Sequence, residues 1–196
     1  MLIPTAPCET EYIVKKSRFI ARLLPVQSRD EVNEALAQAQ RDYPDARHHC
    51  WAYLLGEPAD ARSAGMNDAG EPAGTAGKPI LNVLQHGHLG DVLVIVIRYF
   101  GGIKLGAGGL IRAYGTAAQQ VLDIAVGKPL QVLEQFVASG DFACEQVLRH
   151  WLAENEGQPC GISYNDGVDL QLQIPQTKVD AFREFCAARR IDVQRR

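Results

Sequence analysis

Val92-Leu-Val-Ile-Val-Ile97 leads directly into Arg98-Tyr-Phe-Gly-Gly-Ile-Lys-Leu-Gly-Ala-Gly-Gly-Leu-Ile-Arg-Ala-Tyr-Gly115 at the centre of this 196-residue chain. The first segment is an unbroken run of branched apolar residues, which is typical of a strand buried on both faces. Apolar residues then recur with the period of a helix from about Leu110 to Ala125. The sequence therefore predicts a central strand, a glycine-rich loop over 101–109 and a helix that packs on the sheet.

Glycine is concentrated in this part of the chain, since twelve of its eighteen glycines lie between Gly65 and Gly115. A second block reads Gly70-Glu-Pro-Ala-Gly-Thr-Ala-Gly-Lys-Pro79. Glycine loses the most backbone entropy on folding, so such clusters are used where the chain needs a positive φ or a close approach to another group. That group is either a ligand or another part of the same protein, and the sequence leaves both interpretations open.

The loop over 101–109 is a candidate anion-binding site. Free backbone N–H groups at a helix N-terminus attract negative charge, Lys104 and Arg112 add positive charge, and Arg98 could make a bidentate phosphate contact. Standard phosphate-binding motifs do not fit. The segment 106–111 lacks the third glycine of the dinucleotide fingerprint, and Lys78 is followed by Pro79 where a P-loop has Ser or Thr. The residues predicted to contact phosphate or nucleic acid are Arg98, Gly101, Gly102, Lys104, Gly106, Gly108, Gly109 and Arg112.

The second glycine block is expected to shape the same face. Glu71 could act as a base or pair with a nearby arginine, and a partner-facing or loop-locking role is favoured over catalysis. His48 and Cys50 share one strand face, but no activating third group is evident, so no catalytic residue is assigned. The residues assigned to this second loop are Gly70, Glu71, Gly74, Thr75, Gly77 and Lys78.

Composition and charge are those of an ordinary globular protein, with 46% hydrophobic residues and a formal net charge of −3. Residues 1–130 hold 13 Lys/Arg and 13 Asp/Glu, and residues 131–196 hold 7 and 10, so the excess of positive charge typical of non-specific nucleic-acid binding is absent. The five cysteines have no spacing that suits disulfides or zinc. With no apolar leader and no membrane-length run, we expect a cytoplasmic protein without a membrane segment, metal or cofactor.

Two domains are predicted, residues 1–130 and residues 131–196, with the boundary at Gly127-Lys-Pro129. The second domain shows the order strand, helix, strand, strand, helix, with a closing strand near Ile191, and Asp166-Gly marks a hairpin turn. This order is that of a ferredoxin-like α/β sandwich.

In the first domain, strands are expected within 12–26 and 48–55, and Ser28 is expected to cap a helix. The segment 56–79 is predicted to be a long loop rich in small residues, followed by a short helix. We expect a loop of this length to be functional.

Four segments follow one another along the chain and are distinctive in composition and order: Lys15-Lys-Ser-Arg-Phe-Ile20, Ala46-Arg-His-His-Cys-Trp-Ala-Tyr53 and the two glycine blocks. In these segments the sequence resembles the IMPACT family, in its bacterial, YigZ-type branch. The resemblance covers residues 1–130 closely and the remainder by architecture. One departure is Ala69, which stands where the family often has a second Asp after Asp68.

The resemblance implies an α+β protein, with an N-terminal α/β domain similar to the second domain of a small-subunit ribosomal protein. It implies a C-terminal ferredoxin-like α/β sandwich similar to part of elongation factor G. Eukaryotic relatives regulate translation initiation by competing for an activator of a general-control kinase, and a role at RNA or the ribosome is inferred for bacterial relatives.

The expected function is therefore that of a non-enzymatic protein that binds nucleic acid, the ribosome or a translation factor. Two alternatives remain open. One is a small-molecule phosphotransferase or hydrolase that uses the glycine loop, with Glu71 or Asp68 as its base. The other is a regulator that binds only proteins.

Overall fold

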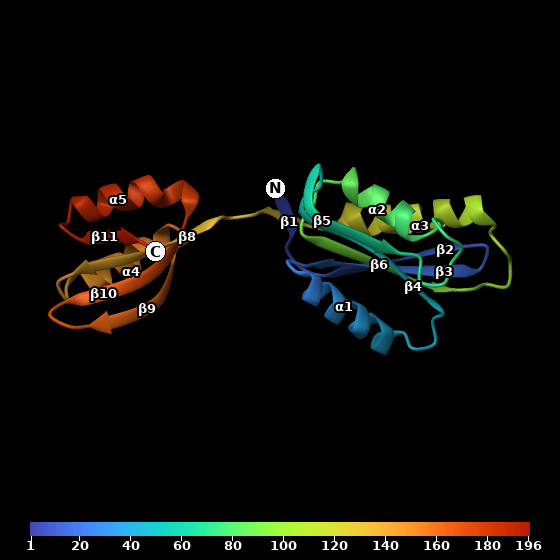
Figure 1. Cartoon of the computed structure of the whole chain (residues 1–196), viewed down its shortest axis with the longest axis horizontal. Helices are drawn as coiled ribbons and strands as arrows, with labels where there is room; N and C mark the ends of the chain where they lie inside the picture. Colours follow the sequence, from blue (N-terminus) through green and yellow to red (C-terminus); the bar gives the residue numbers. More distant parts are fainter. The chain divides into compact units, whose positions relative to one another are not determined.

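A computed structural model describes all 196 residues, which divide into two compact units, Met1–Leu130 and Gln131–Arg196. Each unit has a main sheet of its own (Figure 1). Each also has its own buried hydrophobic residues, on both faces of the sheet in the first unit. The first unit contains β1 (Leu2–Pro4), β2 (Cys8–Val14), β3 (Ser17–Pro25), α1 (Arg29–Asp42), β4 (His48–Glu57), β5 (Asp60–Asn67), α2 (Gly77–Gln85), β6 (Val92–Tyr99), α3 (Ala107–Ile124) and β7 (Gly127–Pro129).

The main sheet of the first unit has five strands in the order β2-β3-β6-β4-β5, with every pair antiparallel. As predicted, the branched apolar run forms the central strand, β6, in which Val92 to Ile97 are completely buried. Its two faces are covered by different helices: α2 and α3 pack on one, and α1 packs on the other (Figure 1). Burial on both sides explains why the strand is apolar at every position and does not alternate.

The predicted cap of α1 is confirmed, since the Ser28 hydroxyl accepts a hydrogen bond from the Glu31 N–H at 3.2 Å. Val32 and Ala39 are the buried residues of this helix and lie against the sheet.

The prediction of a long loop over 56–79 is wrong for its first part. Residues Asp60–Asn67 form β5, which pairs with β4 from Trp51↔Asn67 to Glu57↔Asp60. β5 is an edge strand of mostly small and polar residues, which have little strand propensity of their own, so pairing with the apolar β4 determines its conformation. The connection that remains before α2 is the short segment 68–76.

Helix α3 begins at Ala107, three residues before the predicted start at Leu110. Gly108 and Gly109, which were expected to belong to the loop, form its first turn. Glycine has poor helix propensity, so the sequence pattern did not reveal this turn.

The segment Gly127–Pro129, predicted as a boundary, is also a short strand. It is β7, and it pairs antiparallel with β1 through Leu2↔Pro129, Ile3↔Lys128 and Pro4↔Gly127. The first and last strands of the unit are therefore hydrogen-bonded to each other.

The second unit is the predicted ferredoxin-like sandwich, an antiparallel sheet in the order β11-β8-β10-β9. Its core contains Leu148 and Trp151 of one helix and Phe182 of the other. No helix of the chain combines the length and apolar character needed to cross a membrane. The elements of the second unit are β8 (Leu133–Gly140), α4 (Cys144–Glu154), β9 (Gln158–Tyr164), β10 (Val168–Pro175), the 3-10 turn η1 (Gln176–Lys178), α5 (Val179–Ala187) and β11 (Asp192–Arg195).

Candidate functional site

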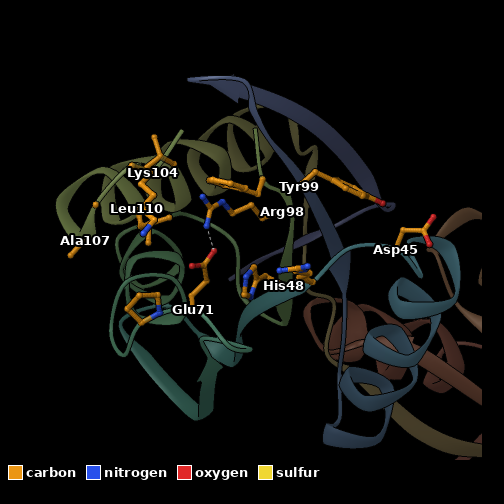
Figure 2. Close-up of a pocket in the computed structure, with 13 residues that line it drawn as sticks. Asp45, His48, Glu71, Arg98, Tyr99, Lys104, Ala107 and Leu110 are labelled. Atoms are coloured by element: carbon orange, nitrogen blue, oxygen red, sulfur yellow. Dashed lines mark hydrogen bonds and ion pairs between the residues drawn. The ribbon is translucent and has the colours of Figure 1, made fainter. Parts of the chain in front are cut away.

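A pocket of about 600 Å³ lies in the first unit, where β6 ends and α3 begins (Figure 2). Its walls come from three connections: the one between α1 and β4, the one before α2, and the one between β6 and α3. The lining residues are Asp45, Arg47, His48, Glu71, Pro72, Arg98, Tyr99, Phe100, Lys104, Leu105, Gly106, Ala107 and Leu110.

The pocket brings part of the two glycine blocks together. Glu71 comes from the second block, and Arg98, Lys104 and Gly106 come from the first. Arg112 does not line this pocket; it lines a separate hollow of about 220 Å³ that Lys15 also lines. The predicted site residues that do not line the pocket are Gly70, Gly74, Thr75, Gly77, Lys78, Gly101, Gly102, Gly108, Gly109 and Arg112.

The first turn of α3 carries backbone N–H groups that no side chain caps. Its N-cap residue, Gly106, has a positive φ of 71° and no side chain, and the turn contains no acidic residue. Ala107 and Gly108 are exposed, and Ala107 lines the pocket. The positive end of an 18-residue helix is therefore open to the pocket.

Helix α2 differs, because its N-terminus is capped by a carboxylate of the same chain. Asp68 accepts hydrogen bonds from the N–H groups of Gly74, Ala76 and Gly77 at 2.8, 2.9 and 2.8 Å. Partial burial by itself would raise the pKa of Asp68, but the three N–H donors together outweigh it and hold the pKa below its ordinary value. The anion position of α2 is already filled by the protein itself.

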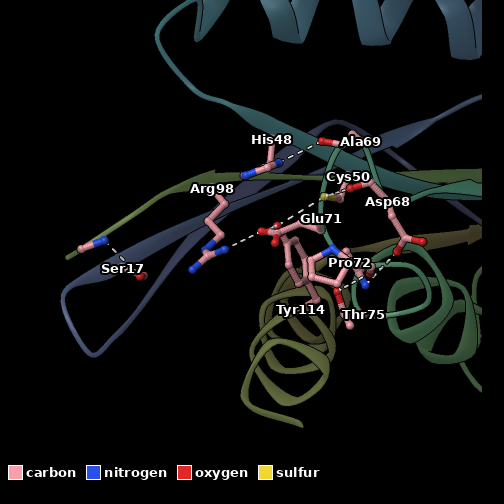
Figure 3. Close-up of polar contacts among 12 residues, drawn as sticks. Ser17, His48, Cys50, Asp68, Ala69, Glu71, Pro72, Thr75, Arg98 and Tyr114 are labelled. Atoms are coloured by element: carbon pink, nitrogen blue, oxygen red, sulfur yellow. Dashed lines mark hydrogen bonds and ion pairs between the residues drawn. The ribbon is translucent and has the colours of Figure 1, made fainter. Parts of the chain in front are cut away.

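A buried polar network joins Arg98 and Glu71 of the pocket to Tyr114 of α3 (Figure 3). Arg98 donates from Nη1 to Glu71 Oε1 at 2.6 Å, and the Tyr114 hydroxyl donates to the same oxygen at 2.8 Å. Arg98 and Glu71 are 7% and 9% exposed, and Arg98 Nε has no hydrogen-bond partner. The predicted bidentate contact of Arg98 with phosphate is not available while Glu71 holds this guanidinium.

Cys50 and His48 serve the packing of the segment 68–76 (Figure 3). The Cys50 thiol donates to the Asp68 carbonyl at 3.0 Å, and His48 Nδ1 lies 2.9 Å from the Ala69 carbonyl. Burial raises the pKa of Cys50 to about 12, so its reactive thiolate form is scarce near neutral pH.

The glycines divide between the two interpretations that the sequence left open. At Gly101 a Cβ would lie 2.0 Å from the Lys16 carbonyl carbon, so this glycine allows two loops to pack. At Gly77 it would lie 2.9 Å from the Asn67 nitrogen. Gly102 and Gly106 have φ of +85° and +71° with open space around them, which leaves room for a ligand.

Several residues of the pocket were not predicted as site residues, among them Arg47, Tyr99, Phe100 and Leu105. Arg47 and His48 are adjacent to the site because β4 pairs with β6 in the register His48↔Arg98. The sequence signal for Arg47 and His48 was their place in the segment 46–53, one of the four family-like segments. Some fifty residues separate them from Arg98 along the chain, and this distance concealed the contact.

A sequence model described as the Impact N-terminal domain matches residues 15–122, more than half of the chain. The chain belongs to the IMPACT family. A second model, described as a domain of unknown function (DUF1949), matches residues 141–187 of the second unit.

Relatives that align over most of their length support this assignment to the IMPACT family. An IMPACT family member of Haemophilus influenzae and the IMPACT family member YigZ of Escherichia coli are each 35% identical to the chain over 181 residues. These alignments cover 92% of the chain and 88% and 89% of the two relatives. A solved structure described as "Crystal structure of an hypothetical protein" matches 98% of the chain and 95% of its own length, with a TM-score of 0.73 and 33% identity.

Proposed function

We propose that this IMPACT family protein is a non-enzymatic binding module of the translation machinery that holds a phosphate group of RNA at the N-terminus of α3. One observation carries the proposal: the uncapped first turn of α3 opens on a pocket that Arg98 and Lys104 also line. At the wall of the same pocket, the buried Nε of Arg98 is a donor without a hydrogen-bond partner.

The electrostatics of the pocket favour an anion. A helix N-terminus carries about half a positive charge, and Lys104 in the adjoining loop is exposed. Arg47 adds a further positive charge to the lining, and the opposing acids are Asp45 and Glu71. Since Glu71 is neutralised by Arg98, the remaining positive groups outnumber the one free carboxylate.

The same geometry favours binding over catalysis. A phosphotransferase or hydrolase would need a general base within reach of its substrate. Glu71 is buried and already accepts hydrogen bonds from both Arg98 and Tyr114, and Asp68 is engaged by three backbone N–H groups. Either carboxylate would have to abandon a structural role to accept a proton from a substrate.

The link to translation is supported by the family resemblance, and the distribution of charge restricts the kind of contact with RNA. The second unit carries a net charge of −3, which opposes a broad electrostatic hold on RNA. We therefore propose a selective contact, made at the ribosome or together with a translation factor, instead of non-specific coating of RNA.

Replacement of Ala107 by Asp tests the proposal because it changes stability and binding in opposite directions. An acidic residue in the first turn of a helix stabilises it by roughly 0.3–1 kcal/mol. The same carboxylate would repel a phosphate at the helix terminus, so binding to purified ribosomes is expected to weaken about tenfold, or ~1.4 kcal/mol. A loss of binding could then not be attributed to unfolding.

Gln120→Glu is the matched control, since it adds the same charge at an exposed position of the same helix. It lies about 20 Å further along α3 at 1.5 Å per residue, beyond the Debye length of about 10 Å at 0.1 M salt. Lys104→Ala should weaken binding and reduce the salt slope by about one unit. Equal ribosome binding by the wild type, Ala107→Asp and Lys104→Ala would overturn the proposed site.

A further inference from the structure

We propose that the pocket takes a single-stranded nucleotide, whose base stacks on Phe100 while its phosphate lies at the N-terminus of α3. This inference rests on the phosphate-binding function proposed above and adds the structural class of the ligand. Phe100 and Ala107 line the same pocket, so an aromatic surface and a positive helix end face one open hollow.

Phe100 is placed as a stacking platform. It is 58% exposed although it directly follows Tyr99, the last residue of the buried strand β6, so its backbone is anchored. The guanidinium of Arg98 lies 5.7 Å from the centre of the Phe100 ring. A ring that is held by a neighbouring cation and remains accessible loses little entropy when a base stacks on it.

The volume of the pocket agrees with such a ligand. At about 600 Å³ it falls within the range of roughly 300–1,000 Å³ that is usual for small-molecule sites. A base and its phosphate can occupy it together. Leu105 and Leu110 add apolar surface to the lining, and Lys104 adds a positive charge.

Stacking on Phe100 requires a base whose face is free. In a duplex both faces of each base are covered by its neighbours, whereas unpaired bases can be splayed onto aromatic side chains. The arrangement therefore selects single strands over duplexes. It also predicts little sequence preference, because every base has a π-face.

Fluorescence anisotropy with a labelled oligoadenylate of about 12 nucleotides, a length within the usual site sizes for single strands, tests this inference. We expect the single strand to bind more tightly than its duplex with oligouridylate. Phe100→Ala should weaken single-strand binding about 5- to 150-fold, the loss usual for one stacked base, while Phe100→Tyr should retain it. Phe142→Ala, which removes a 60% exposed Phe from the second unit, is the matched control and should leave binding unchanged.

A deoxyadenylate arm distinguishes the two sources of such a strand. Equal affinity would support stacking without readout of the 2′-hydroxyl, and tighter RNA binding would support stacking with RNA as the ligand. Unchanged binding by Phe100→Ala, or equal binding of the duplex, would overturn the stacking inference. If Ala107→Asp still weakened ribosome binding, the proposed phosphate site would survive that result. Absence of any binding to ribosomes and oligonucleotides at low salt would overturn both.

Discussion

Arg98 and Glu71 form a buried ion pair, with Arg98 Nη1 and Glu71 Oε1 2.6 Å apart, that joins the end of β6 to the loop before α2. Tyr114 of α3 donates to the same carboxylate. One carboxylate thus connects the strand, the loop and the helix that surround the pocket. The stability of the first unit and the shape of its pocket are therefore expected to depend on the same few side chains.

Glu71→Ala is expected to destabilise the first unit by about 3–5 kcal/mol, because it leaves the buried guanidinium of Arg98 without a counter-charge. The measurement is urea unfolding followed through Trp51, in a Trp151→Phe background that silences the second of the chain's two tryptophans. Glu11→Ala, which breaks the exposed pair of Glu11 with Arg18, is the control and should have a much smaller effect. A loss below about 1 kcal/mol for Glu71→Ala would contradict the structural role of the pair.

Asp68→Ala is expected to cost roughly 0.5–2 kcal/mol, the usual loss for a helix cap, because three N–H groups at the start of α2 lose their acceptor. The pKa of Asp68 is lower in the folded protein than in the unfolded chain. Its contribution is therefore fully present above the ordinary carboxyl pKa of about 3.9 and is lost as the pH falls through the lower folded pKa.

The stability difference between wild type and Asp68→Ala should accordingly shrink on acidification from pH 7 to about pH 2, in unfolding curves recorded at each pH. Asp166→Asn, in the turn between β9 and β10 of the second unit, serves as the control. A difference that stays constant with pH would show that the Asp68 carboxylate does not act as the cap.

Two glycine substitutions are expected to have opposite effects on stability. Gly101→Ala would place a Cβ 2.0 Å from the Lys16 carbonyl carbon and 2.3 Å from the Ser17 nitrogen, so it should destabilise by at least ~1–3 kcal/mol through backbone displacement. Gly115→Ala lies within α3 with open space around it and should stabilise by roughly 0.5–1 kcal/mol. Thermal unfolding of both variants checks the signs; a stable Gly101→Ala would mean that the two loops do not pack as described.

The cysteines should differ sharply in reactivity at pH 8. Burial raises the pKa of Cys50 to about 12 and that of Cys186 to about 11, so about one Cys50 thiol in 10,000 is ionised at that pH. Cys160 is the exposed cysteine and should be alkylated first, with Cys50 and Cys186 protected until the chain unfolds. Peptide mapping after a short iodoacetamide pulse measures the order, and Cys160→Ser should remove the fast reaction. Alkylation of Cys50 as fast as that of Cys160 would refute its burial.

The sequence predicted those elements whose residues carry a strong pattern. The run Val92–Ile97 is apolar at each position because both of its faces are buried. In the second unit, a strand such as β10 alternates because only one of its faces is buried, and that pattern revealed the ferredoxin-like order. β5 was missed because its small and polar residues have no pattern apart from their pairing with β4.

The candidate site was predictable only in part. Lys104 and Gly106 could be identified because they lie beside the strand-to-helix junction in the sequence itself. The pairing of Arg98 with Glu71 was one of two interpretations of that carboxylate, and only the folded chain decides between them. Arg47 and His48 reach the pocket through the register of β4 on β6, which depends on the whole sheet and not on local spacing.

The pairing of β1 with β7 has a mechanical consequence. Since Leu2 lies opposite Pro129 and Pro4 opposite Gly127, a pull that separates the two ends of the first unit loads this short ladder one residue pair at a time. These pairs would separate in sequence before the force acted on the five-stranded sheet. A force applied through the polypeptide that follows β7 would therefore break the hydrogen bonds between β1 and β7 first, and the pocket would keep its shape.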